Sequence, residues 1–225
     1  MATERRDFIS SVGQDDIAEL SALGSIKTFE RGRPLFHEGQ VADCVLILNT
    51  GVVKVTSTTS TGREVVLDFR GAGELIGDLA AIDGYPRSAT ICAVEPVEAL
   101  CLPTQTFMRF LEERPAITLV LLRMLASRLR DADAKRIEFS TYTTIERVAA
   151  RLLEFSERFG REDESGAVHI SLPLSQEELA GATGASLESI GRALQTMRGL
   201  NCVETRRREI RIVDPRGLAA LCADA

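Results

Sequence analysis

Residues 174–194 read LSQEELAGATGASLESIGRAL, and their spacing is the clearest structural signal in the chain. Ala180 is small where a second helix has to cross closely, and Gly184, four residues later, allows a sharp turn. Ile190 follows six residues after this glycine, where an aliphatic side chain packs back onto the first helix. The spacing predicts a helix-turn-helix, whose second helix enters the major groove of DNA. An ordinary helical hairpin is the alternative that this segment alone leaves open.

The second of these helices is expected to present polar side chains to solvent. Glu188 and Arg192 are four residues apart, so they share one face of a helix, next to Leu187. An arginine can donate two hydrogen bonds to guanine, a glutamate can accept one from N4 of cytosine, and a leucine can contact the methyl group of thymine. On a helix that does not read DNA, the same pair would be a surface salt bridge.

A basic hairpin follows this helix. Residues 197–213 predict a strand, a tight turn and a second strand, with the arginines 206–208 at the tip, where they are suited to bind phosphate. Residues 187–211 contain six arginines against three glutamates, although the whole chain carries a net charge of −6. A solvated run of charge is the alternative for the three arginines by themselves. The predicted DNA-contacting residues are Ser175, Gln176, Ser186, Leu187, Glu188, Ser189, Arg192, Arg206, Arg207 and Arg208.

The middle of the chain predicts one long helix. Residues 116–143 contain neither glycine nor proline, and Pro115 stands where a helix would begin. Such a helix is ~40 Å long, more than a small barrel can cover, so we expect it to pair with its copy in a second subunit. Packing of the helix on its own domain is the alternative. The expected stripe of contact residues is Ile117, Leu121, Met124, Arg128, Ala132, Lys135 and Phe139.

Strands are predicted before the long helix, and mixed structure after it. Short segments rich in β-branched residues alternate with glycines at intervals of about ten residues, which is typical of a β-sandwich or barrel. These segments are 45–48, 52–56, 65–69 and 89–94, and a helix at 15–23 precedes them. After the long helix we expect an amphipathic helix at 145–158, a polar loop at 160–166 and a short strand ending at Pro173.

Composition excludes several classes of protein. With 44% hydrophobic and 27% charged residues, the chain has the balance of an ordinary globular protein. Its five cysteines form no closely spaced pair, and two histidines are too few for a histidine-rich metal site. No segment approaches a signal peptide or the ~20 apolar residues of a membrane span. We therefore expect a cytoplasmic protein that does not bind membranes. We see no catalytic triad or Walker loop, so we do not expect an enzyme.

Together these features resemble the superfamily of the cyclic AMP receptor protein and the fumarate-nitrate reduction regulator (Crp/Fnr). The motif Glu188-x-x-Gly191-Arg192 matches the base-reading segment of that family, whereas Leu187 stands where the cyclic AMP receptor protein has an arginine. The resemblance implies an α+β fold. Its three parts would be an effector-sensing β-roll (a double-stranded β-helix or jelly roll) at 1–113, a long dimerisation helix at 114–143, and a winged helix-turn-helix DNA-binding domain at 144–225. It also implies a homodimer formed through 114–143 that reads an inverted repeat in double-stranded DNA and contacts RNA polymerase.

Residues 73–90 resemble the phosphate-binding cassette of cyclic nucleotide domains. Backbone N–H groups near Gly77 can point at a phosphate, and Arg87 and Ser88 can donate hydrogen bonds to it. A glycine-rich turn with a structural arginine is the alternative. The resemblance extends to Arg128, which matches a pocket arginine of the long helix. The effector-binding residues that it implies are Gly77, Asp78, Leu79, Arg87, Ser88, Ala89, Arg128, Ala132 and Asp133.

Three of these residues depart from the pattern of cyclic AMP binders. Asp78 stands in place of a glutamate that takes the ribose hydroxyl, and Ala132 and Asp133 stand in place of hydroxyls that grip adenine. We therefore expect a phosphate-bearing effector that is not cyclic AMP in the familiar pose. A cyclic dinucleotide, another nucleotide and no ligand at all remain as alternatives.

Other sensor chemistries of the superfamily receive less support from the sequence. No cysteine precedes Cys44, so an N-terminal iron–sulfur cluster is not expected, and His37 is expected to be a loop histidine and not a haem ligand. Cys92 and Cys101 are expected in the core of the strands. The predicted function is a DNA-binding transcription regulator that senses a small effector. The alternatives are an effector-independent regulator of the same family and a nucleotide-binding regulatory protein that does not use DNA.

Overall fold

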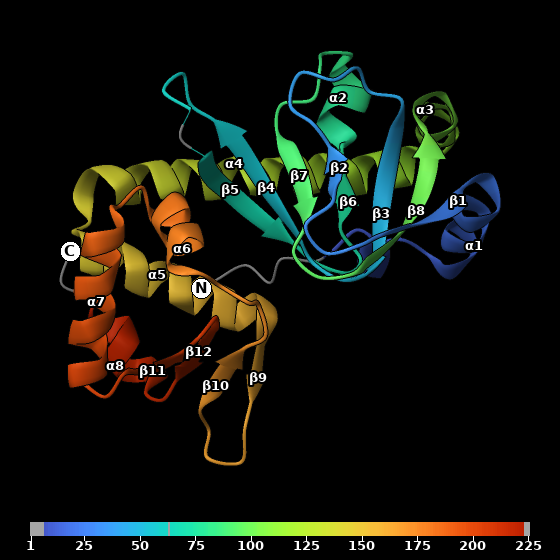
Figure 1. Ribbon diagram of the computed structural model, residues 1–225. Helices are drawn as coiled ribbons and strands as arrows, with labels where there is room; N and C mark the ends of the chain where they lie inside the picture. The colour runs from blue at the N-terminus through green and yellow to red at the C-terminus, as the bar shows by residue number, and fades with distance from the viewer. Residues whose placement is uncertain (1–6, 63, 223–225) are drawn as a thin grey trace. The chain divides into compact units, whose positions relative to one another are not determined.

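The computed structural model describes residues 7–62 and 64–222, and these residues divide into two compact units between Ala132 and Asp133 (Figure 1). The first unit contains a 3-10 turn Ile9–Ser11, α1 (Gln14–Leu23), β1 (Ser25–Phe29), β2 (Pro34–Phe36), β3 (Cys44–Thr50), β4 (Val53–Thr58), β5 (Glu64–Arg70), β6 (Leu75–Ile76), α2 (Asp78–Asp83), β7 (Thr90–Ala93), β8 (Val97–Pro103), α3 (Thr104–Glu113) and most of α4 (Pro115–Thr141). The second contains the end of α4, α5 (Thr144–Phe159), β9 (Gly160–Glu162), β10 (Val168–Ile170), α6 (Gln176–Thr183), α7 (Leu187–Gly199), β11 (Val203–Arg206), β12 (Glu209–Ile212) and α8 (Pro215–Ala220).

The strands of the first unit form a β-roll of two antiparallel sheets. One sheet has the order β1-β8-β3-β6 and the other β2-β7-β4-β5. Successive side chains point to opposite faces of a strand, and five consecutive residues of β3 are buried, so this strand is covered on both faces. Cys44, Leu46 and Leu48 point into the roll, while Val45 and Ile47 pack against the helices outside. The predicted β-roll is confirmed.

The first half of α4 packs on its own β-roll. Ile117 and Leu121 are buried in the cluster that also holds α1 and α3, and Met124 and Leu125 lie against it. Ile117 and Leu121 belong to the stripe that the sequence predicts as a coiled-coil seam, and that prediction is wrong for these two residues because they are buried within their own subunit. The stripe is the inward face of the helix, because a single β-roll offers enough apolar surface to cover its first turns.

The opposite face of α4 is apolar and exposed. Leu119, Leu122, Leu129 and Ile137 are between 45% and 64% exposed, and their spacing places them along one side of a helix of 3.6 residues per turn. This second stripe was missed in the sequence because the inward stripe masks it: a helix that is apolar on two faces shows no single clear period.

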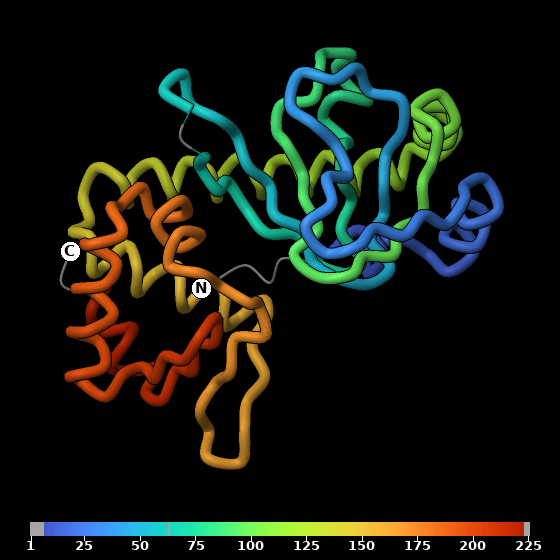
Figure 2. The backbone as a smooth tube through the Cα atoms, in the orientation of Figure 1, coloured from blue at the N-terminus to red at the C-terminus, as the bar shows by residue number. Residues whose placement is uncertain are grey.

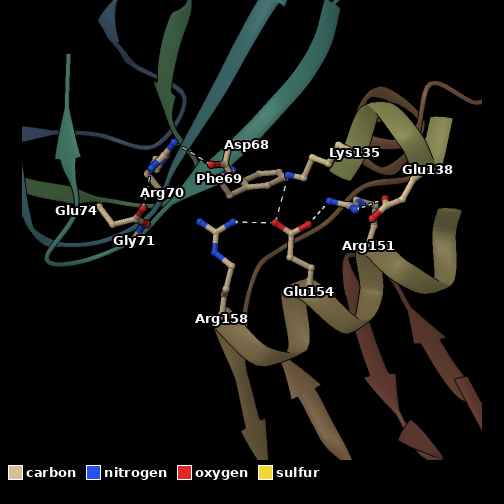
Figure 3. Close-up of polar contacts among 10 residues, drawn as sticks. All are labelled: Asp68, Phe69, Arg70, Gly71, Glu74, Lys135, Glu138, Arg151, Glu154 and Arg158. Atoms are coloured by element: carbon tan, nitrogen blue, oxygen red, sulfur yellow. Dashed lines mark hydrogen bonds and ion pairs between the residues drawn. The ribbon is translucent and has the colours of Figure 1, made fainter. Parts of the chain in front are cut away.

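In the second unit, ion pairs attach the end of α4 to α5 (Figure 3). Arg151 is buried and pairs with Glu138 of α4 and Glu154 of α5. Glu154 also pairs with Lys135 at 3.3 Å and with Arg158 at 3.2 Å. Because Arg151 is surrounded by carboxylates, its burial is compensated by charge and hydrogen bonds. The last turns of α4 therefore belong to the second unit.

Residues 160–170 form a hairpin that projects from the second unit (Figure 2). The polar loop that the sequence predicts at 160–166 is wrong for β9, because this short strand completes the sheet β11-β12-β10-β9. Asp163 shapes the turn. Its carboxylate accepts hydrogen bonds from the hydroxyl and backbone N–H of Ser165 and from the backbone N–H of Ala167, and it forms an ion pair with Arg211. These donors, led by the Ser165 hydroxyl, hold the pKa of Asp163 below its ordinary value.

The remaining helices agree with the predicted order, with additions. The helix at 15–23, the long helix and the helix at 145–158 are confirmed by α1, α4 and α5, whereas α2, α3 and α8 were not predicted. The domain boundaries at 113/114 and 143/144 stay predictions. Among the described residues, no helix combines the length and apolar character that crossing a membrane requires.

Candidate nucleic-acid interface and effector site

The helix-turn-helix is formed by α6 and α7. Ser175 caps α6 by accepting a hydrogen bond from the Glu178 N–H at 3.1 Å, and the Glu178 carboxylate accepts one from the Ser175 N–H at 2.8 Å. Gly184 ends α6 with φ +64°, a left-handed conformation that favours glycine. Ala180 and Ile190 are buried between the helices, as their spacing predicts. The motif is thus a packed element with its second helix at the surface.

The exposed face of α7 presents Glu188 and Arg192. The Arg192 guanidinium donates to the Glu188 carboxylate at 3.0 Å, and the two side chains are 68% and 78% exposed. Arg192 also donates to the hydroxyl of Ser189 at 3.4 Å. An exposed helical pair of this kind stabilises a fold by only ~0.5 kcal/mol. Breaking the ion pair so that each side chain can contact a base edge would therefore cost little free energy.

Gly191 lies on the same face and has no structural reason to be glycine in the free protein. A Cβ built at this position has nothing described within 4 Å, and the backbone is helical. A glycine inside a helix costs about 1 kcal/mol relative to alanine. The open backbone next to Arg192 fits a helix whose surface has to come close to another molecule.

The hairpin β11–β12 carries exposed arginines at its tip. Arg206, Arg207 and Arg208 are all exposed, and Arg208 has φ +60°, which is unusual for a residue with a side chain. At the start of α6, hydrogen bonds from the Glu177 backbone and from Ser175 lower the pKa of Glu177, and the positive charge of Arg208 adds a smaller effect in the same direction.

The other predicted DNA-contacting residues occupy the starts of the two helices. Ser186 caps α7 by accepting from the Ser189 N–H at 3.1 Å, and Leu187, the first residue of α7, is half-exposed. Gln176 is exposed at the start of α6, beside Ser175. All ten predicted residues thus lie on the two helices, on their caps or on the hairpin tip, and they remain predicted contacts.

In the first unit, Arg87 is sequestered in the protein. It is only 4% exposed, donates to the carbonyl oxygens of Gly77 at 2.9 Å and Cys44 at 2.5 Å, and lies 3.7 Å from the centre of the Phe36 ring. Its Nε is buried and has no hydrogen-bond partner among the described residues. Asp43 approaches it at 3.5 Å. In this conformation Arg87 connects residues 73–90 to the start of β3, which agrees with the alternative that Arg87 is a structural arginine.

The second cationic group of the predicted effector site is also paired. Arg128 donates to the Asp78 carboxylate at 2.5 Å and to the Leu75 carbonyl at 3.2 Å. Burial and the neighbouring Arg70 lower the pKa of Arg128, while Asp78 opposes this effect. Arg70 itself pairs with Asp68 and with Glu74, each at 3.0 Å (Figure 3). A compact charged cluster therefore lies along the inward side of α4.

The remaining predicted effector residues are less closely joined. Gly77 has φ +82°, and a Cβ there would stand 2.4 Å from an Arg87 nitrogen, so only glycine fits. Leu79 and Ser88 are exposed at the surface, and Ala89 is buried. Ala132 and Asp133 are exposed on α4. The structure thus joins Gly77 to Arg87 and Asp78 to Arg128.

Sequence reasoning missed the groups that hold these arginines. Phe36, the Cys44 carbonyl and the Leu75 carbonyl contact Arg87 or Arg128. Two of the three are backbone carbonyls, and the residue type at a position does not predict which side chain its carbonyl will bind. The aromatic residue next to His37 was a signal, because arginines often stack on rings.

The cysteines show no sign of reactivity. Burial and the neighbouring Cys101 raise the pKa of the Cys44 thiol to about 12, and burial also raises that of Cys92. Cys101 is buried as expected, whereas Cys92 is only half-buried. His37 is exposed after β2, and no group of acidic, histidine or cysteine side chains in the described ranges could hold a metal.

These two units define a protein that joins a β-roll to a winged helix-turn-helix. The family model of the cyclic nucleotide-binding domain matches residues 26–114, and that of the Crp-like helix-turn-helix domain matches residues 146–221. The chain is 30% identical over 215 residues to the CRP-like cAMP-activated global transcriptional regulator of Mycobacterium tuberculosis, covering 96% of both proteins. The chain belongs to the Crp/Fnr superfamily of transcription regulators.

Solved structures show the same fold. FixK2 from Bradyrhizobium japonicum has a TM-score of 0.78 and 22% identity, over 90% of this chain and 98% of that one. The c-di-GMP responsive global regulator CLP of Xanthomonas campestris has a TM-score of 0.76 and 19% identity, over 89% and 99%. At these identities the likeness establishes the fold alone.

Gly191→Ala should separate the stability of α7 from its binding function. We expect the free energy of unfolding to rise by about 0.5–1 kcal/mol, because alanine is the better helix former and its Cβ meets open space. We expect affinity for a selected DNA duplex to fall, because the methyl group intrudes where a base would approach. Chemical denaturation and fluorescence anisotropy measure the two effects. Unchanged affinity would show that this face does not touch DNA.

Proposed function

We propose that the protein is a homodimer that binds an inverted-repeat operator through α7 and the β11–β12 hairpin, and whose β-roll responds to a small phosphate-bearing effector. The observation that carries the DNA-binding part is the Glu188–Arg192 pair, exposed next to the open backbone of Gly191. Arg192 would donate to guanine, Glu188 would accept from cytosine, and Leu187 would contact a thymine methyl group. Half-sites would lie about one turn of DNA, ~34 Å, apart.

The arginines at the wing tip would have a different task. Arg206, Arg207 and Arg208 are exposed on a tight hairpin turn, where they can reach phosphates but carry no base information. Ser175, Gln176, Ser186 and Ser189 can add hydrogen bonds to the backbone of the same half-site, since they lie at the starts of the two helices.

Arg192→Ala and Arg207→Ala should weaken DNA binding in different ways. Arg192→Ala should cost roughly 1–3 kcal/mol of binding free energy and relax specificity at one base pair. Arg207→Ala should weaken binding to all sequences about equally and reduce the salt dependence by about one phosphate contact. The measurement is a salt titration on a selected operator and its single-base variants. If Arg192→Ala kept the full preference of the parent, the base-reading role would be wrong.

The homodimer would form through the outward face of α4. Leu122 and Leu129 are 61% and 64% exposed in the single chain, and with Leu119 and Ile137 they form a stripe opposite the buried residues. Two such stripes can pack against each other as a coiled coil. Burial of these leucines would remove apolar surface from water at ~25 cal/mol per Å².

Leu129→Glu should dissociate the dimer without unfolding the subunit. The charge would be buried without a partner in the dimer, which is costly, but solvated in the free chain. We expect the dimer dissociation constant to rise at least about tenfold, as measured by analytical ultracentrifugation. Val41→Glu, at a valine that is 84% exposed on the β-roll, is the matched control and should leave it unchanged. A dimer as tight as the parent would place the interface elsewhere.

The effector would bind at the cassette of the β-roll. The family model of the cyclic nucleotide-binding domain supports a nucleotide, and the relatives include one named as cAMP-activated and one described as c-di-GMP responsive. In this chain, Ser88 is exposed at the end of the cassette, and Arg87 has an unpaired Nε. An effector-independent regulator is the second candidate, because Arg87 and Arg128 already have internal partners.

Calorimetry against cyclic AMP, cyclic GMP and cyclic di-GMP should decide between these candidates. Under the effector proposal, one of them binds, and Ser88→Ala weakens it by about tenfold, since a lost hydrogen bond costs about 1 kcal/mol or slightly more. Thr61→Ala, in the exposed β4–β5 turn, is the control. The absence of binding by all three would favour the effector-independent candidate.

We also infer RNA polymerase as a protein partner and the cytoplasm as the location. Both follow from the role of a transcription regulator, which acts where DNA is transcribed. The third candidate, a nucleotide-binding protein that does not use DNA, is disfavoured by the Crp-like helix-turn-helix and its exposed arginines.

A further inference from the structure

The end of α4 lies on the turn of the helix-turn-helix. The ring of Phe139 covers Gly184: a Cβ built on that glycine would stand 2.7 Å from a ring carbon. Glycine is favoured at position 184 by its φ of +64°, and the ring of Phe139 leaves little room for a Cβ there. Phe139 belongs to the last turn of a helix whose N-terminal half packs on the β-roll, whereas Gly184 lies in the turn just before Ser186, the N-cap of α7.

Arg147 joins the same two elements by hydrogen bonds. It donates to the carbonyl of Thr183, the last residue of α6, at 3.0 Å, and to the carbonyl of Tyr142, the residue after α4, at 2.8 Å. Its guanidinium also lies 5.6 Å from the centre of the Phe139 ring. Carbonyls at helix ends lack partners within the helix and carry partial negative charge. A single cation thus satisfies the ends of two helices that are separate in sequence.

The neighbouring ion pairs leave the end of α4 little freedom against α5. Glu138 on α4 pairs with Arg151 on α5, one helical turn beyond Arg147, and Lys135 pairs with Glu154, two turns beyond it. The joint at Tyr142 and Thr143 is therefore held on both sides. A change in the direction of α4 near Lys135 would be passed to Gly184 through side chains that are already in contact.

We propose that Phe139 and Arg147 are positioning residues that lock the end of α4 onto the turn between α6 and α7. The recognition helix and the last two turns of α4 then move as one body, and the short connection at 142–143 is not a free hinge. Reorientation of α7 in response to an effector has to bend α4 before Lys135. This inference rests on the proposed function for the role of α7, but the lock itself is a property of the fold.

Hydrogen exchange of the full-length chain tests the lock without DNA. Arg147→Met should speed exchange by about tenfold or more in the peptides covering 140–147 and 183–190 together, because both helix ends lose a charged donor. Peptides from β3 and β4 should be unchanged. Arg147→Lys keeps the charge but not the forked geometry, so it should recover only part of the protection. Arg136→Met, at an exposed arginine of α4, is the matched control and should leave both segments protected.

Two patterns of exchange would overturn the lock. If only 140–147 became faster, Arg147 would cap α4 without holding the turn; if all of residues 133–222 became equally faster, it would stabilise the unit in general. Phe139→Leu provides the test if Arg147→Met does not fold, and a few-fold rise at the same two segments is expected. An unchanged rate at 183–190 in both Phe139→Leu and Arg147→Lys would also contradict the lock.

Operator binding by the same variants tests the positioning role. On a duplex selected with the parent chain, Arg147→Met should lower specific affinity by about tenfold with an unchanged salt slope, because no phosphate contact is lost. Unchanged affinity in a variant with a loosened turn would show that the lock does not position α7. If the parent selected no duplex at all, the proposed function would fail, while the exchange experiment would still decide the lock.

Discussion

One helix, α4, has to satisfy packing demands on two faces and at both ends. Ile117 and Leu121 on its inward face are buried in the core of the β-roll. Lys135 and Glu138 in its last turns form ion pairs with α5. Its outward face remains apolar and exposed at Leu122 and Leu129. In the proposed dimer, α4 would be a shared element that each subunit already holds in place on its inward face and at its end.

In the predicted effector site, both arginines are already bound by groups of the protein itself. Arg87 is held by two carbonyls and an aromatic ring, and Arg128 by a buried aspartate. Removing either cation from its partners would leave a buried polar group unsatisfied, which costs about 1–3 kcal/mol and more for a charge. An effector has to replace these interactions with its own. Such competition favours a ligand with at least one full negative charge near Arg87, whose Nε is still unpaired.

The sequence predicted those parts of the molecule that depend on spacing. The turn at Gly184, the cap at Ser175 and the pair Glu188–Arg192 lie where local rules place them. It could not predict which stripe of α4 faces inward, because both stripes are apolar and only the β-roll decides between them. The partners of Arg87 were hidden for another reason: a backbone carbonyl, such as that of Cys44, is available at every position.

The charge distribution of the chain relates the proposed reading of DNA by α7 to the proposed positioning of α7 by Phe139 and Arg147. The chain is acidic overall, with a net charge of −6, yet six arginines against three glutamates fall within residues 187–211. An acidic surface repels DNA at a distance and weakens non-specific binding, so the proposed contacts of α7 would have to supply more of the affinity. Base contacts fail when the helix is misplaced by a small distance. A regulator that relies on them therefore gains from a rigid support for α7, and Arg147 and Phe139 provide contacts of that kind.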